Sequence, residues 1–84
     1  MNSYLPELMK RITVHSNVMA GRPTIRGLRF PVADILELFA DGMSIDEILI
    51  QHPLLEREDI IAALYYAAAN LNGSVRQGIK TKRQ

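Results

Sequence analysis

Gly21–Val32, which reads GRPTIRGLRFPV, is the most informative part of the sequence. Glycine permits the positive φ angles of tight turns and proline fixes its own φ, so the stretch contains strong turn signals. Arginines alternate with apolar residues between the turn formers. This alternation predicts a hairpin, or a pair of short strands, over Thr24–Phe30 with a bend at Gly27. Pro31 suits the start of a helix, where its missing N–H is not needed.

A second short strand is predicted upstream, where polar and apolar residues alternate over Arg11–His15. A sheet this small has open edges and is barely stable by itself. The chain has 84 residues and no cysteine, so it forms one small domain without disulfides. We therefore expect a homodimer that is built at least partly through this β-element.

Apolar periodicity downstream of the β-element predicts a first pair of helices. One begins near Pro31 and ends at Gly42, with apolar residues spaced i, i+3, i+4 and i+7 along one face. A capping box over Ser44–Glu47 starts the next, because the serine hydroxyl and the glutamate carboxylate can each accept a backbone N–H. Pro53 ends it, since the residue before a proline is pushed out of the α region.

A third helix is predicted from about Arg57 to about Leu71, where Asn72–Gly73 closes it. Because the last two helices are spaced like a helix-turn-helix, we expect a mainly α, homeodomain-like helix-turn-helix domain with a short N-terminal β-element. The expected organisation is an N-terminal extension over residues 1–11, one domain over 12–73, and a basic, flexible tail over 74–84.

Charge is segregated along the chain although the net charge is only +1. Residues 8–31 carry five cations and no acid, residues 32–75 carry eight acids and a single cation, and residues 76–84 carry four cations and no acid. The basic ends favour a polyanion or an acidic protein surface as partner, with solvated surface charge as the alternative. Phosphates would be repelled by Glu58 and Asp59 at the start of the third helix. DNA contacts are therefore expected on a basic ribbon or arm formed by Arg22, Arg26, Arg29 and the basic tail, and Arg57 is a further candidate DNA-binding residue.

Patterns typical of catalytic, metal or cofactor sites are missing from the sequence. His15 and His52 stand alone, and without cysteine they cannot join a metal-ligand set. Gly21–Gly27 lacks the Lys-Ser/Thr ending of a phosphate-binding loop. No apolar run approaches the ~18 residues of a membrane span, and no signal-peptide pattern opens the chain. We expect a cytoplasmic protein that is not an enzyme and uses neither metal nor cofactor.

The stretch Gly21–Val32 resembles the hallmark of DUF433, a bacterial family of domains of unknown function. Leu28, Phe30 and Glu56 depart from the residues that are usual in that family. The resemblance covers roughly Ile12–Ala69. Further matches follow in the family order and spacing: Asp41-Gly42-Met43-Ser44, Glu47-Ile48-Leu49, His52-Pro53-Leu54-Leu55, Glu58-Asp59-Ile60, Ala62-Ala63-Leu64 and Tyr66-Ala67-Ala68.

This resemblance implies membership of a two-gene toxin–antitoxin operon whose toxin is often a small PIN-like nuclease. The chain would be the antitoxin and would repress its own promoter DNA. A nuclease of that type holds divalent metal between carboxylates, so a basic segment could enter its acidic pocket. The candidate toxin-binding residues are Arg76, Lys80, Lys82 and Arg83. The alternatives are a free-standing helix-turn-helix transcriptional regulator without a toxin and a dimerising adaptor.

Overall fold

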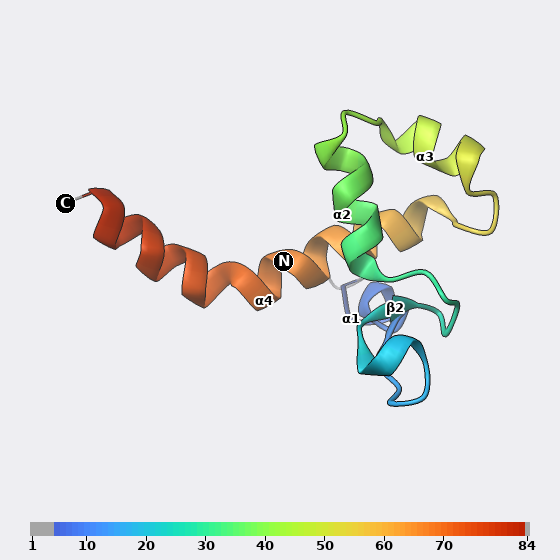
Figure 1. Ribbon diagram of the computed structural model, residues 1–84, viewed down its shortest axis with the longest axis horizontal. Coiled ribbons are helices and arrows are strands. Elements are labelled where there is room, and N and C mark those ends of the chain that lie inside the picture. The colour runs from blue at the N-terminus through green and yellow to red at the C-terminus, as the bar shows by residue number, and fades with distance from the viewer. Residues whose placement is uncertain (1–4, 84) are drawn as a thin grey trace.

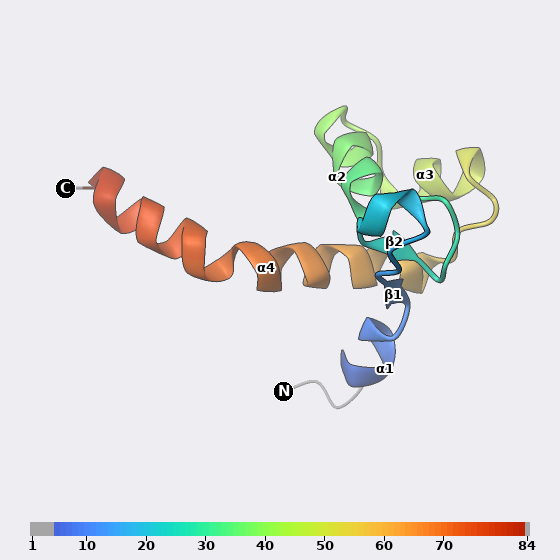
Figure 2. The same cartoon turned by 60° about the horizontal axis from the view of Figure 1, so that its bottom comes forward.

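The computed structural model describes the backbone of residues 5–83 and the side chains of residues 5–71 (Figures 1 and 2). Over this range the chain is a mainly helical domain with a two-stranded antiparallel sheet, as predicted. The elements in chain order are α1 (Leu5–Met9), β1 (Ile12–Thr13), a 3₁₀ turn (Met19–Gly21), β2 (Thr24–Ile25), α2 (Val32–Ala40), α3 (Ile45–Gln51) and α4 (Arg57–Arg83).

The predicted β-element is present, although its strands are short. Ile12 of β1 lies opposite Ile25 of β2. The chain then reverses at Arg26 and Gly27, whose φ angles are 47° and 72°. The N–H of Leu28 donates to the Ile25 carbonyl at 2.7 Å, which closes a turn of the type I′ kind. Gly27 therefore bends the hairpin where the sequence predicted.

The boundaries of α2 and α3 confirm the predicted start and stop signals. Pro31 is the N-cap residue of α2, and Gly42 follows its end with a φ of 93°. The capping box of α3 is formed, since Ser44 Oγ accepts the N–H of Glu47 at 3.1 Å and Glu47 Oε1 accepts the N–H of Ser44 at 2.8 Å. Pro53 lies just beyond the end of α3.

The hydrophobic core lies where β2, α2 and α3 pack on the first half of α4 (Figure 1). Ala62 and Ala63 of α4 are fully buried, and their small side chains let the neighbouring elements approach the helix closely. The buried residues that form the central cluster are Ile25, Val32, Ile35, Ile48, Leu55, Ile60 and Ala63.

Two predicted boundaries were wrong. The third predicted helix does not end near Leu71, because α4 continues through Asn72–Gly73 to Arg83. A glycine inside a helix costs only about 1 kcal/mol relative to alanine, so Gly73 is a weak stop signal. The N-terminal extension is also part of the fold, since α1 packs on α4 and buries Leu8.

The C-terminal part of α4 leaves the domain. A helix of 27 residues is about 40 Å long, and only its first half has other described elements beside it (Figures 1 and 2). Within residues 5–83, no helix is both long enough and apolar enough to cross a membrane.

Candidate functional site

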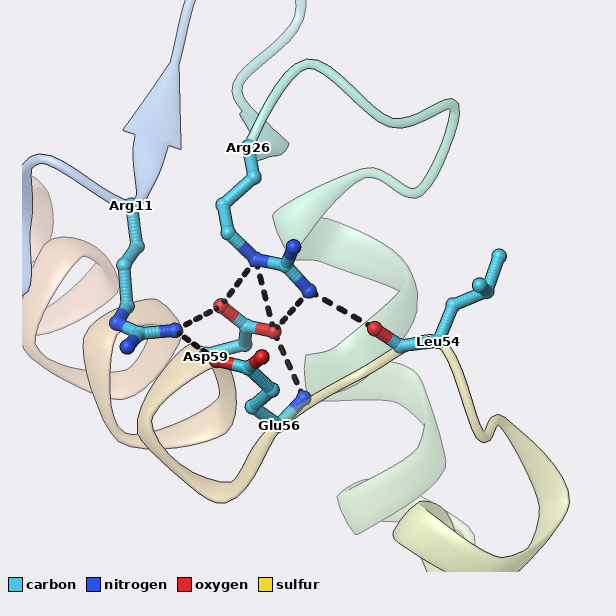
Figure 3. A network of polar contacts seen from close by, with 5 residues as sticks. All are labelled: Arg11, Arg26, Leu54, Glu56 and Asp59. Atoms are coloured by element: carbon cyan, nitrogen blue, oxygen red, sulfur yellow. Dashed lines mark hydrogen bonds and ion pairs between the residues drawn. The ribbon is translucent and has the colours of Figure 1, made fainter.

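A buried carboxylate joins the hairpin to α4. Asp59 lies in the first turn of α4 and has no exposed surface. Arg26 of the hairpin turn donates from Nε to Asp59 Oδ1 at 3.0 Å and from Nη2 to Oδ2 at 2.8 Å (Figure 3). Arg11, which directly precedes β1, donates from Nη1 to Oδ1 at 2.9 Å. One carboxylate thus holds two arginines that come from different parts of the chain.

The remaining hydrogen bonds complete this network. The backbone N–H of Glu56 donates to Asp59 Oδ2 at 2.8 Å, so Asp59 also caps the start of α4. Arg26 Nη2 donates to the Leu54 carbonyl, and Arg11 Nη1 donates to Glu56 Oε1, both at 2.8 Å. Among the side chains that the structure describes, no buried nitrogen or oxygen lacks a partner. The network therefore stabilises the fold, because each of its buried polar groups has a hydrogen-bond partner.

These contacts fix the charges of the network. Burial raises the pKa of the Asp59 carboxyl, but the hydrogen bonds from Arg26, from the Glu56 N–H and from Arg11 outweigh it, and the pKa lies below its usual value. The side-chain hydrogen bond to Asp59 raises the pKa of Arg26, and those to Glu56 and Asp59 raise the pKa of Arg11. All three groups stay ionised at neutral pH.

Arg26 has an uncommon backbone conformation, which its side-chain contacts stabilise. Its φ of 47° is uncommon for a residue with a Cβ. Such a conformation persists only where surrounding contacts compensate its cost, and here the guanidinium group reaches Asp59 and Leu54. Arg26 is therefore a structural residue of the hairpin.

The four predicted DNA-binding arginines fall into two groups. Arg26 is held by Asp59, and Arg57 pairs with Asp46 of α3. Arg22 and Arg29 are exposed, and neither pairs with a carboxylate among the side chains of residues 5–71. The free positive charge of the hairpin is therefore carried by Arg22 and Arg29.

The predicted toxin-binding residues lie on the projecting part of α4, and their side chains are outside the described residues. The backbone places them on one continuous helix with the core segment. This set consists of Arg76, Lys80, Lys82 and Arg83.

An apolar pocket of about 230 Å³ lies between the start of α2 and α4, and the sequence did not indicate it. Arg22 brings a charged group to a lining that is otherwise almost entirely apolar. The pocket fits one or two apolar side chains of a docked protein better than a polar metabolite. Among residues 5–71, no three His, Asp or Glu side chains converge to hold a metal ion. The apolar residues of the pocket include Pro23, Val32, Leu36, Tyr66, Ala67 and Leu71.

The model of the family described as "Protein of unknown function (DUF433)" matches residues 12–67. The chain belongs to the DUF433 family. The match includes both strands, α2, α3 and the first turns of α4. The projecting part of α4 lies beyond the matched range.

The chain is also similar to one curated protein and to one solved structure. The chain is 37% identical over 59 residues to the uncharacterized protein y4eO of Sinorhizobium fredii (strain NBRC 101917 / NGR234), and the match covers 70% of this chain. It covers only 27% of that relative, so this DUF433 chain spans about a quarter of its length. The crystal structure of a DUF433 member protein from Anabaena variabilis ATCC 29413 is similar, with a TM-score of 0.71 and 30% sequence identity. That similarity covers 88% of this chain and 73% of the Anabaena chain.

Proposed function

We propose that this DUF433 chain is the antitoxin of a type II toxin–antitoxin pair and binds a PIN-like nuclease toxin without being an enzyme itself. The proposal rests on the length of α4 and on the charge of its C-terminal part. The helix continues to Arg83 beyond the domain, and from Arg76 onward the sequence has four cations and no acid. A basic helix of this kind suits the carboxylate-lined metal pocket of a nuclease, where arginine can pair with carboxylates through two hydrogen bonds.

The pocket between α2 and α4 supports the same proposal. Its apolar lining suits an anchor side chain from the toxin, and the exposed Arg22 can meet an acidic group beside that anchor. Pocket and basic segment lie along the same helix, so one partner protein can contact both.

The experiment is a growth assay with the adjacent open reading frame of the operon. The neighbour is induced alone and then together with this chain. We expect arrest by the neighbour and rescue on co-expression. Truncation after Ser74 should abolish rescue, and a full-length variant with glutamine at the four cationic positions should weaken it strongly. A neighbour that is well expressed and causes no arrest would contradict the antitoxin function.

DNA binding is the second candidate, with a free-standing transcriptional regulator as its simplest form. It is favoured by Arg22 and Arg29, which are exposed on the hairpin and unpaired among the described side chains. If both contact phosphates, replacing both with alanine should lower the salt slope of promoter binding by about 2. Arg26 is unsuitable for this test because its loss would disturb the fold. An unchanged slope would contradict a role for these two arginines in DNA binding.

A further inference from the structure

One side of α4 is apolar and exposed. Ile61, Leu64, Ala68 and Leu71 follow one another at intervals of three, four and three residues, and we call this set the α4 stripe. Leu64 is 40% exposed and Leu71 is 52% exposed, and Ala68 is exposed as well. The sequence continues the spacing with Val75. Alternating three- and four-residue intervals are the pattern by which one helix packs along another in a coiled coil.

The surface beside the stripe is hollowed. Leu5 and Met9 of α1 border a hollow of about 400 Å³ with Tyr65 and Ala68 of α4. A second hollow of about 240 Å³ lies along the same helix between Leu64 and Ala68. The two hollows lie beside exposed apolar residues of the stripe, so they can receive side chains from a second helix.

The charges along α4 indicate which helix fits. The start of α4 is acidic, because Glu58 is half-buried in its first turn and the exposed Glu56, which also contacts Arg11, directly precedes it, whereas the sequence of α4 ends in cations that include Lys80 and Arg83. A second copy in antiparallel orientation brings the basic end of each helix beside the acidic start of the other. A parallel copy would bring the basic ends together, and like charges would repel.

We propose that two copies of this chain pair antiparallel along the α4 stripe. The spacing sets Ala68 of one copy against Leu71 of the other, so that a small side chain meets a large one. Leu64 then faces position 75 of the partner. A two-fold axis repeats each contact, and the projecting part of each α4 covers the stripe of the other copy.

This inference goes beyond the proposed function and adds a dimer contact on α4. The expected contact of the β-element with a second subunit stays a prediction, and within the chain β1 pairs with β2 and Thr24 forms a further bridge to Pro31. The dimer is measured on the chain alone, so the two proposals can fail independently.

The first test is the mass in solution of the full chain by sedimentation equilibrium. We expect about 19 kDa, twice the 9.5 kDa of one chain. Ala68→Glu should raise the dissociation constant of the dimer about tenfold or more, because it forces two carboxylates into an apolar contact. Asn70→Glu is the matched control, since position 70 lies about 200° around the helix from Ala68. Both positions are exposed, and circular dichroism checks that both variants stay helical.

The second test is the orientation of the two helices. The chain has no cysteine, so Thr81→Cys provides a single site for a spin label. Antiparallel pairing in this register separates the two labels by about 35 Å along the axis, whereas parallel pairing leaves them within about 20 Å. Three results would each overturn the proposal. The chain could stay monomeric at about 0.1 mM, the two spin labels could lie at the short distance, or Ala68→Glu and Asn70→Glu could change the dissociation constant of the dimer equally.

Discussion

Arg26 binds both carboxylate oxygens of Asp59, with Nε 3.0 Å from Oδ1 and Nη2 2.8 Å from Oδ2. The residues are 33 positions apart, so this contact fastens the hairpin to the start of α4. Arg11 supports the same carboxylate through one hydrogen bond at 2.9 Å. The two arginines are therefore unequal partners of one buried charge.

Arg26→Ala should lower the free energy of unfolding by about 2–3 kcal/mol, somewhat less than for a fully buried ion pair, because water reaches part of Arg26. Arg11→Ala should cost less, since Arg26 still neutralises Asp59. Arg26→Lys should recover only part of the loss, because an ammonium group cannot form the two-pronged contact. Urea denaturation measures the free energy of unfolding of the three variants. A larger decrease for Arg11→Ala than for Arg26→Ala would contradict the prediction.

The stability of the chain should depend on pH through Asp59. Its pKa lies below the usual value in the folded state, so the folded chain holds the carboxylate more readily than the unfolded chain does. This contribution is fully present above the unfolded pKa of about 4 and is lost as pH falls through the lower folded pKa. The wild-type chain should therefore lose its stability advantage over Asp59→Asn as pH falls below about 4. An advantage that stays constant from pH 7 to pH 2 would argue against this role.

Gly27→Ala should lower the free energy of unfolding by about 1 kcal/mol, because a residue with a Cβ is strained at positive φ. The φ of Gly27 is 72°, and an added Cβ would meet nothing within 4 Å, so strain and not a clash sets the cost. Gly27→Asn should be milder, since asparagine tolerates this conformation better. Thermal melts of both variants compare their stabilities. An equal decrease in stability for Gly27→Ala and Gly27→Asn would contradict backbone strain as the cause.

Ser44→Ala should lower the free energy of unfolding by about 1 kcal/mol through loss of the α3 cap. The Ser44 hydroxyl accepts the Glu47 N–H at 3.1 Å, and alanine leaves that N–H to water. Ser44→Asp provides the control, because its carboxylate can cap the helix in the same way. If Ser44→Asp is as unstable as Ser44→Ala, the capping bond contributes little.

Local signals predicted much of this fold. The bend at Gly27, the capping box at Ser44 and the end of α3 before Pro53 are each decided within a few residues, so the sequence alone identified them. The continuation of α4 through Gly73 was missed, because one glycine adds too little cost to stop a helix. The buried Leu8 was missed because a helix as short as α1 has no repeat from which periodicity can be detected.

The candidate site was harder to predict than the fold. Arg26 and Arg57 look like free cations in the sequence, but Asp59 and Asp46 hold them in the structure. These pairs depend on which segments the fold brings together, and nothing local encodes that. Arg26 and Asp59 are 33 residues apart, and Arg11 and Asp59 are 48 apart.

The sharing of Asp59 by two arginines also limits the order in which substitutions can accumulate. Arg11 can change first, because Arg26 alone still compensates the buried carboxylate. Asp59 cannot change first, since its loss would leave two guanidinium groups facing each other across the same space. Exchanging the two members of one ion pair, so that the arginine and the aspartate trade positions, does not help either. The remaining arginine would then face another arginine at position 59. Asp59 can therefore be replaced on a stepwise path of single substitutions only after one of the two arginines has changed.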